Sequence, residues 1–400
     1  MTGAATPPPD TSDRLDGLGF LLVAGSLGFA LGSIAISQSL LALAVLVWIA
    51  AAVRDRRRPD VPPFFLPLVV YALATFASAA MSLDPAASFW DSRQLLLLLV
   101  VPVTARFARG ARAMTALDVI IALGAASAVW GVVQYNIFGF DDLDARPSGS
   151  LGHYMTYSGV VMLVLTVTVA RLAFHGREWI WPAIALPALV VALGVTQARN
   201  AWIGAGMAVT TIFALWRPRL IWIVPVAAVL MFAVSPAGIR DRALSMFDMN
   251  DPTVRDRFAM LKVGAGIVRD YPVFGVGPEM VESVYRDYRP PEGVNEVNPH
   301  LHNVPVQIAA ERGLLALGVW LWFVVVAMLD LLAQARKGPA RALATAGLAA
   351  MVAMLGAGLF EYNFGDSEFL ILLLGLITLP YAAARGAASA GASTDAARAS

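Results

Sequence analysis

Long, nearly uninterrupted apolar blocks recur from one end of this 400-residue chain to the other. A helix of about 20 mostly apolar residues crosses the roughly 30 Å hydrocarbon layer of a membrane, and the blocks are about that long. Because 58% of the residues are apolar and only 14% are charged, the composition is also typical of a polytopic membrane protein. The strict alternation of an outer-membrane barrel is absent, so we expect an all-α membrane fold.

The blocks predict a bundle of about twelve transmembrane helices with one long loop. Nine spans fall within 17–234 and three within 304–385, with 235–303 as the loop between them. The expected spans are 17–34, 36–53, 64–81, 94–108, 114–135, 153–171, 179–196, 200–216, 218–234, 304–333, 340–360 and 367–384. The end segments 1–16 and 386–400 are expected to be a disordered and a flexible cytoplasmic tail, and nothing in the first resembles the basic start of a signal peptide.

Basic residues separate the short connections into two sets. Every second connection is rich in Arg or Lys, whereas the alternate ones hold at most one Arg each, and some hold several acids. The basic connections are 54–60, 106–112, 171–177, 216–219 and 335–341. Because short cytoplasmic loops carry the excess of Lys and Arg, this pattern predicts that both termini are cytoplasmic.

Cysteine content and net charge exclude several classes of function. The chain has no cysteine, which excludes disulfides, thiolate metal sites and a thiol nucleophile. Its formal net charge is only +1, and the basic residues are spread among loops instead of forming a stripe. We therefore expect membrane lipids as partners and no nucleic acid.

The long loop is expected to contain amphipathic helices. Its first helical stretch places Val254, Phe258, Leu261, Ala265 and Val268 at 4,3,4,3 spacing, which predicts one apolar face. The segment YPVFGVGP (271–278) then supplies a proline and two glycines for a tight turn. A second short amphipathic pattern follows over 279–289 and suits a helix that lies on the bundle or in the headgroup layer.

The segment NPHLHNVPVQIAAERG (298–313) gathers polar side chains at the mouth of an apolar span. Asn303 is a good N-cap, and Asn303, Gln307 and Glu311 follow at i, i+4 and i+8 on one helix face. Such a stripe is expected to face the bundle interior or a water-filled cavity. The alternative is that Asn303 only caps, Glu311 pairs with an arginine and the histidines lie in a wet loop. His300 and His302 alone do not make a metal site, since no third ligand has convincing spacing.

A few arginines fall on the side that the basic connections avoid. Arg199 lies in a very short turn, Arg255 and Arg257 begin the amphipathic helix, and Arg146 with His153 precedes another span. Arginine binds phosphate oxygens in a bidentate way, so this set describes a site for a lipid-linked diphosphate. The alternative for each arginine is an extended side chain that reaches phospholipid headgroups.

These motifs resemble the bacterial O-antigen ligase and polymerase superfamily of polytopic, GT-C-like glycosyltransferases. HNVPVQIAAERG is similar to the ligase pattern of His-Asn, nine residues and Gly, at His302, Asn303 and Gly313. DYPVFGVGP (270–278) is similar to the family's aspartate-proline-glycine turn, and TQARNAWIGAG (196–206) to its arginine-bearing turn. The resemblance covers roughly residues 60 to 380. Three residues after the glycine, where the ligase pattern has Gly, Thr or Tyr, this chain has Ala316.

The resemblance implies an enzyme that transfers a glycan from undecaprenyl diphosphate to a sugar hydroxyl of the lipid A core. It implies inversion at the anomeric carbon, no metal and no other cofactor, with the site at the periplasmic face of the bacterial inner membrane. His302 would be the general base, and Arg199 and Arg257 would contact the diphosphate. Residues with a possible role in shaping the site are Arg146, His153, Arg255, His300, Asn303, Gln307 and Glu311.

Two other functions remain open at this stage. A polymerase that acts on lipid-linked repeats of O-antigen or exopolysaccharide shares much of the same sequence pattern. A polysaccharide transporter or flippase is a different class of protein with a similar number of helices. A transporter is expected to carry ionisable residues near the middle of the membrane, whereas the polar residues noted here lie at helix ends.

Overall fold

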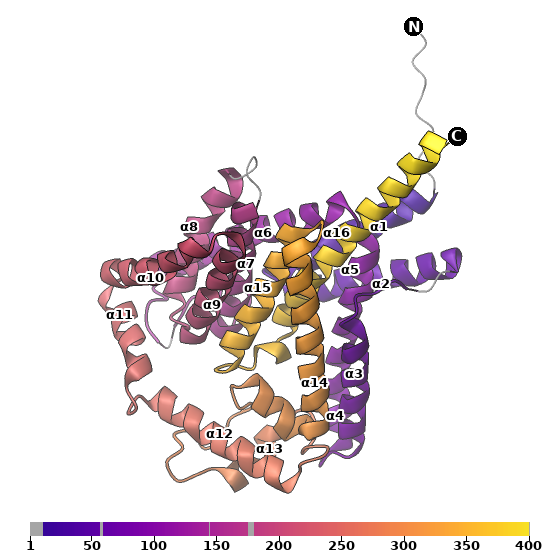
Figure 1. The fold of residues 1–400 in the computed structure, drawn as a ribbon. Helices are drawn as coiled ribbons and strands as arrows, with labels where there is room; N and C mark the ends of the chain where they lie inside the picture. The colour runs from indigo at the N-terminus through magenta and orange to yellow at the C-terminus, as the bar shows by residue number, and fades with distance from the viewer. Residues whose placement is uncertain (1–10, 57–58, 144, 175–179, 400) are drawn as a thin grey trace.

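A computed structural model describes residues 11–56, 59–143, 145–174 and 180–399, with side chains for those between 14 and 385. Every element of this described part is a helix (Figure 1). In chain order they are α1 (Thr11–Phe29), α2 (Ile34–Asp55), α3 (Phe65–Ala80), α4 (Pro85–Asp91), η1 (Ser92–Leu99), α5 (Val100–Phe107), α6 (Ala111–Ile137), α7 (Tyr154–Phe174), α8 (Ile180–Val195), α9 (Arg199–Trp216), η2 (Pro218–Trp222), α10 (Ile223–Val234), α11 (Ala237–Leu244), η3 (Ser245–Phe247), α12 (Pro252–Asp270), α13 (Val281–Tyr288), α14 (Val304–Lys337), α15 (Arg341–Gly358), η4 (Asn363–Gly365) and α16 (Ser367–Ala399).

The expected spans lie mainly on these helices, but not all of them reach membrane length alone. Within the described residues, seven helices or helical series are long and apolar enough to cross a membrane. Three further apolar helical segments are shorter: Phe65–Ala80, Ile180–Val195 and Pro218–Val234. The fold is therefore all-helical, as expected, and fits a multi-pass membrane protein, whereas the number of twelve crossings stays a prediction.

The two ends of the chain differ from the expected tails. The backbone of α1 is already helical at Thr11, and α16 continues to Ala399, so parts of both end segments extend helices. The first expected span, 17–34, crosses a break, because α1 ends at Phe29 and Ser33 caps α2 by accepting from the Ile36 N–H (3.5 Å). The described chain begins and ends at the same end of the bundle (Figure 1).

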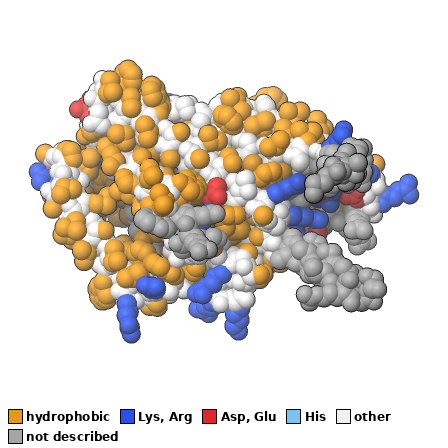
Figure 2. Space-filling view, turned by 90° about the horizontal axis from the view of Figure 1, so that it is seen from above, with side chains coloured by type: hydrophobic (Ala, Val, Ile, Leu, Met, Phe, Trp, Pro, Cys, Tyr) orange, Lys and Arg blue, Asp and Glu red, His pale blue; other side chains and the backbone are white. Residues whose placement is uncertain are grey.

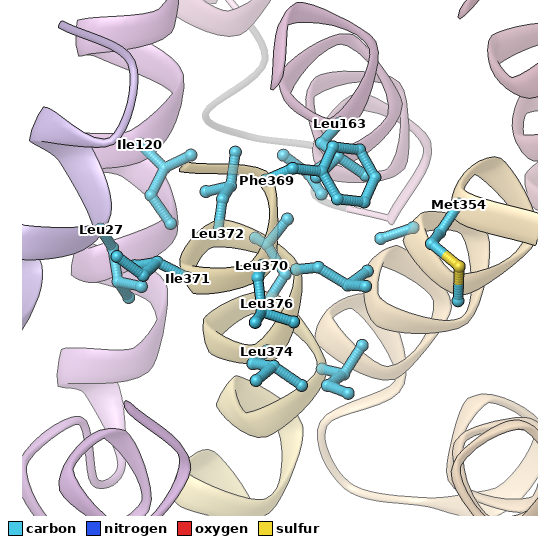
Figure 3. Packing of buried hydrophobic residues seen from close by; sticks show 14 of the residues in the cluster. Leu27, Ile120, Leu163, Met354, Phe369, Leu370, Ile371, Leu372, Leu374 and Leu376 are labelled. Carbon is cyan, nitrogen blue, oxygen red and sulfur yellow. The ribbon is translucent and has the colours of Figure 1, made fainter. Parts of the chain in front are cut away.

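Helix α16 forms the centre of the bundle. Its residues from Phe369 to Ala382 are nearly all buried, which agrees with a sequence that is apolar on every side. Figure 3 shows Leu27 of α1, Ile120 of α6, Leu163 of α7 and Met354 of α15 around it. Since lipid tails are as apolar as these side chains, close packing and not transfer from water must hold such helices together.

Small residues bring α9 and α15 into close contact. Gly204 lies against the backbone carbonyl of Ala353, and a Cβ built on Gly356 would lie 3.4 Å from the Gly204 Cα. Small residues at helix interfaces allow this approach and increase the van der Waals contact that membrane helices depend on. This packing fixes α9, whose first residue is Arg199.

The segment from α11 to α13 leaves the bundle and lies across the end opposite the two chain ends (Figure 1). It has a small core of its own, in which Met260, Val263 and Ile267 of α12 pack with Tyr285 and Leu301. The helix predicted here is present as α12, but the apolar face read from the spacing is not the face that packs into this core. Phe258 and Leu261 are 50% and 39% exposed, because the helix buries a neighbouring face.

A break in α14 locks the loop after α12 onto the bundle. Gly313 has a φ of 78°, which a residue with a Cβ rarely adopts, and any Cβ there would overlap the Val273 carbonyl. The Val276 N–H donates to the Ala310 carbonyl (3.0 Å) and the Gly277 N–H to the Glu311 carbonyl (2.9 Å). The tight turn expected over 271–278 is thus docked on α14, more than two helix turns beyond His302.

Ion pairs join neighbouring segments at the end of the bundle that carries both chain ends. Arg106 donates to Asp16 (3.1 Å) and to Asp55 (2.8 Å), and Arg385 donates to Asp60 (2.8 Å). Figure 2, which looks onto this end, shows mainly apolar side chains with Lys and Arg along parts of the edge. Arg106 and Arg385 therefore have carboxylate partners on neighbouring segments.

Candidate functional site

Two histidines converge on one buried glutamate at the start of α14. His302 Nδ1 lies 2.8 Å from Glu361 Oε2, and His300 Nε2 lies 3.1 Å from Glu361 Oε1. Glu361 follows α15 in the turn before α16, 59 residues from His302 along the chain. The side chain of Glu361 is 6% exposed, against 17% for His302 and 30% for His300, so the glutamate lies beneath two partly accessible imidazoles.

The backbone around His302 is held in an unusual conformation. His302 has a φ of 47°, in the left-handed region that few non-glycine residues adopt. The Leu301 N–H donates to Gln307 Oε1 (2.6 Å), and Asn303 caps α14 by accepting from the Val306 N–H (3.0 Å). Asn303 Nδ2 also donates to the Leu359 carbonyl (3.0 Å), which ties the histidine segment to the segment that carries Glu361.

The charges of this cluster fix which atoms carry protons. Burial alone would raise the pKa of Glu361, but the neighbouring charges and hydrogen bonds of His302 and His300 outweigh it and lower the pKa well below the usual range. Burial would lower the pKa of His300, yet the hydrogen bond and charge of Glu361 raise it. An ionised Glu361 can only accept, so His302 must donate from Nδ1. Its Nε2 is then the atom available to accept a proton when the ring is neutral.

His302 lines a cavity of about 550 Å³ whose polar lining is dominated by cations. Four arginines line it, and none of the lining residues within the described chain is acidic. The lining residues are Arg146, Tyr154, Met155, Gln197, Ala198, Arg199, Asn200, Ile203, Arg242, Met246, Phe247, Met249, Thr253, Val254, Arg257, Phe258, Leu261, Leu301, His302, Asn303, Leu359 and Phe360. Such a cavity suits an anion with apolar groups attached.

Two of these arginines share one carboxylate, which is also a helix cap. Arg199 Nη2 and Arg242 Nη1 lie 3.6 and 3.7 Å from opposite oxygens of Asp251. Asp251 accepts from the Val254 N–H (3.1 Å) at the start of α12, and Arg199 Nη1 also donates to Ser245 Oγ (2.8 Å). Burial, together with Arg199 and Arg146 nearby, lowers the pKa of Arg242 to about 10.

The other two arginines face the cavity from different segments. Arg257 Nη1 is buried and makes no hydrogen bond to any described residue, and burial lowers the pKa of this guanidinium. Arg146 lies over the ring of Tyr154, with Cζ 3.3 Å from the centroid. A buried guanidinium N–H with no acceptor costs free energy, so an anion in the cavity would stabilise this arrangement.

An apolar groove continues from the arginine-lined cavity. Its volume is about 730 Å³, its walls come from α7, α8, α9, α10 and α11, and Ile203 and Met246 line both spaces. α10 has no buried residue, so it covers the groove without being packed into the core. The two spaces together could hold a molecule with a charged head and a long apolar chain.

A smaller cavity of about 240 Å³ lies on another side of the same histidine. His302, Arg257, Met155 and Thr253 line both this cavity and the larger one. Asp256 Oδ1 accepts from the Asn295 N–H (3.2 Å), which helps to hold the loop that forms one wall. His302 is therefore placed where two cavities meet.

The structure brings together most of the residues singled out in the sequence. His302, Arg199, Arg257, Arg146 and Asn303 line one cavity, and His300 shares Glu361 with His302. His153 is exposed beside this group, with its ring 5.3 Å from that of Tyr154.

Three of the proposed site-shaping residues lie elsewhere or act indirectly. Arg255 is exposed and donates to the Glu292 carbonyl (3.3 Å), so it is not part of the cavity. The polar stripe of α14 does turn inward, since Gln307 and Glu311 are 1% and 3% exposed. Glu311, however, pairs with Arg312 (2.5 Å) beneath the docked loop, which is the alternative considered for it. Gln307 supports the site indirectly, through the hydrogen bond that it accepts from the Leu301 N–H.

The sequence did not predict that Glu361 and Arg242 belong to the site. Glu361 belongs to a short acidic turn, EYNFGDSE, in which no spacing relates it to a histidine 59 residues away. Arg242 lies in GIRDRALSMF between two expected helices and looks like an ordinary loop cation. Glu361 also supplies a third potential ligand beside His300 and His302, which spacing along the chain did not show.

Residues 184–321 match the protein-family model described as O-antigen ligase. The match supports membership of the O-antigen ligase and polymerase superfamily, and with it a glycosyltransferase-like ligase or polymerase activity on lipid-linked glycans in general. It spans Arg199, Arg242, Arg257 and His302, whereas Glu361 lies beyond it. No curated protein matches the chain.

Proposed function

Starting from this family match, we propose that the protein is an O-antigen ligase-like glycosyltransferase. It moves a glycan from undecaprenyl diphosphate to a sugar hydroxyl of the lipid A core, at the periplasmic face of the inner membrane. The observation that carries this proposal is the His302–Glu361 pair on the wall of a four-arginine cavity that continues into an apolar groove.

The donor occupies both spaces. Its diphosphate is bound by Arg199, Arg242 and Arg257, because guanidinium groups match phosphate oxygens in charge and geometry. Its polyprenyl chain lies in the 730 Å³ groove, whose lining is apolar and which joins the cavity at Ile203 and Met246. The buried Arg257 Nη1, which has no described acceptor, supports an anion at this position.

His302 is the general base of the transfer. A sugar hydroxyl is a poor nucleophile, so its O–H proton must leave as the new C–O bond forms. His302 Nε2 takes this proton, and Glu361 holds the opposite ring nitrogen and stabilises the imidazolium that results. The anomeric carbon then exchanges its bond to the diphosphate oxygen for a bond to the acceptor oxygen. Attack from the face opposite the leaving group inverts the anomeric configuration.

The arginines stabilise the leaving group. Negative charge grows on the diphosphate as its bond to the sugar breaks, and cations already in place around it need little reorganisation. The acceptor sugar enters the 240 Å³ cavity, which meets the donor cavity at His302 and Arg257. The role assigned to the arginines requires no metal, so full activity is expected in EDTA.

Deletion of the gene, followed by a gel of the surface glycolipids, tests this assignment. Loss of a ligase leaves lipid A core with no attached repeat. Core carrying a single repeat would instead identify a polymerase, and an unchanged pattern would contradict both activities in this pathway. Complementation with the His302→Ala variant checks that the phenotype depends on the proposed site.

A further inference from the structure

We propose that His300, His302 and Glu361 also form a Zn²⁺ site, and that Zn²⁺ bound there inhibits the enzyme. The binding is independent of the proposed function. The inhibition rests on it, because it requires His302 to be the base. Inhibition differs from a catalytic role for the metal and is compatible with full activity in a chelator.

The three residues present their ligand atoms to one point. One nitrogen of each histidine and one carboxylate oxygen lie within 4.8 Å of one another, with contacts of 2.8 and 3.1 Å between the histidines and Glu361. In a tetrahedral zinc site with bonds of about 2.0–2.1 Å, ligand atoms lie roughly 3.3 Å apart. Small ring movements therefore convert the hydrogen-bonded cluster into a coordination sphere.

The ligand types match those of zinc sites with an open position. Two imidazole nitrogens and one carboxylate oxygen are the three protein ligands of such sites, and a water is the fourth ligand of the tetrahedron. His300 and His302 are partly exposed, so the ion can reach them, whereas Glu361 is almost completely buried beneath them. The Glu361 carboxylate supplies the oxygen ligand, at hydrogen-bond distance from both histidines.

The ligands are also held in place before any ion arrives. Asn303 ties the histidine segment to the Leu359 carbonyl (3.0 Å), two residues before Glu361. The Tyr362 N–H donates to Glu361 Oε1 (3.1 Å), which orients the carboxylate. Outer contacts of this kind increase metal affinity. The arginines of the neighbouring cavity act in the opposite direction, so we expect micromolar rather than tighter binding.

Coordination through Nδ1 removes the base. A neutral imidazole carries one proton, and when Nδ1 binds a metal that proton resides on Nε2. The Nε2 atom then can donate but cannot accept the proton of a sugar hydroxyl. Zinc also displaces the hydrogen bond between His302 and Glu361. Bound Zn²⁺ therefore inhibits the transfer without having to block the cavity.

Equilibrium dialysis of the tag-free, detergent-solubilised full chain against micromolar Zn²⁺ tests the site. We compare wild type with Glu361→Gln, with His300→Ala and with a matched control, Glu296→Gln. Glu296 is an exposed carboxylate of the preceding loop whose partner is Arg286 (3.6 Å). Wild type and Glu296→Gln should bind one ion per chain, and the other two variants should bind about 10- to 100-fold more weakly.

Cobalt spectroscopy separates loss of a ligand from loss of the fold. Co²⁺ substitution should give the strong visible absorption of a tetrahedral site in wild type and in Glu296→Gln, but not in His300→Ala. Melting temperatures measured without metal show whether each variant is folded. Equal zinc binding by all four proteins, or no saturable binding by wild type, would overturn the proposed site.

Glycan transfer assays distinguish failure of the proposed zinc site from failure of the proposed function. Micromolar Zn²⁺ should inhibit wild type, and excess chelator should restore full activity. In His300→Ala, the zinc concentration that halves that variant's own activity should rise at least tenfold. Zinc that binds without inhibiting would contradict His302 as the base and leave the metal site standing. A protein that binds zinc but transfers no glycan under any condition would contradict the proposed function alone.

Discussion

The arginines named at the two ends of the bundle differ in their ion-pair partners. At the end that carries both chain ends, Arg106 binds Asp16 and Asp55, and Arg385 binds Asp60. At the other end, four arginines line one cavity, two of them share the single carboxylate of Asp251, and Arg257 Nη1 has no hydrogen-bond partner among the described residues. Paired cations need no further partner, whereas a buried guanidinium N–H without an acceptor, such as that of Arg257, costs free energy that a bound anion offsets.

This contrast predicts that substitutions at the cavity end affect transfer far more than those at the paired end. The largest effect is expected for His302→Ala, which removes the proposed base. Transfer should fall by about 10² to 10⁴-fold, measured with purified protein and lipid-linked donor. His153→Ala is the matched control, since His153 is exposed and is not among the residues that line the cavity, and it should lose much less. Intact transfer by His302→Ala would exclude this histidine as the base.

The next largest effect is expected for the cavity arginines. Arg199→Ala and Arg257→Ala should each reduce transfer about 10²-fold, because each removes a cation from the leaving diphosphate. Arg199→Lys should restore only part of the activity, since an ammonium group cannot make a bidentate contact. Full rescue by lysine would show that charge alone matters at this position.

Glu361→Gln should reduce the turnover number by about 10²-fold and leave the KM for the donor nearly unchanged. The glutamine keeps the shape but not the charge that holds the Nδ1 proton of His302 and stabilises its imidazolium form. The pH profile of transfer should also differ between Glu361→Gln and wild type, which a purely structural role of Glu361 would not produce. A raised donor KM with an unchanged turnover number would instead place Glu361 in substrate binding.

A smaller effect, on stability, is expected from Asp366. Burial and the charge of Glu361 raise the pKa of Asp366 from 3.8 to about 7, so the folded protein binds the proton more tightly than the unfolded chain does. Its contribution to stability is complete below pH 3.8 and is lost as the pH rises through about 7. The melting temperature should therefore fall as the pH rises from 3.8 to about 7, and less steeply in Asp366→Asn. An unchanged slope in the variant would contradict this assignment.

The smallest effect is expected for Arg106→Ala at the paired end. Its ion pairs are partly exposed, with the arginine side chain 20% accessible, and such pairs contribute roughly 0–1 kcal/mol. Melting temperature should decrease slightly, and transfer should stay within about twofold of wild type. A large loss of transfer in this variant would remove the distinction between the two ends.

Much of the fold could be predicted because membrane helices are encoded locally. A block such as the one around Ile371 reveals its helix through length and apolarity alone. Asn303 as an N-cap and the inward-facing Gln307 were likewise predictable, because capping and helical spacing involve near neighbours in sequence. The buried face of α12 could not be predicted, because that helix has two apolar surfaces and spacing does not tell which one packs and which one lines a cavity.

Of the His302–Glu361 pair, Glu361 could not be predicted from the sequence. His302 stands in a recognisable motif, but Glu361 reaches it only because α14 and α15 pack together and Asn303 ties the two segments. The sharing of Asp251 by Arg199 and Arg242 depends in the same way on how η3 and α12 return to the bundle. Contacts between distant segments are set by tertiary packing, which leaves no periodic trace in one sequence.

Direct binding of undecaprenyl diphosphate to the purified protein tests the central claim, that the arginines of the 550 Å³ cavity form the site of a lipid diphosphate. Three proteins are compared in detergent by native mass spectrometry or by retention of radiolabelled lipid: wild type, the double variant Arg199→Ala with Arg257→Ala, and Arg106→Ala. Wild type and Arg106→Ala should bind equally, and the double variant at least tenfold more weakly, which corresponds to about 1.4 kcal/mol or more. Equal binding by all three proteins would contradict the account.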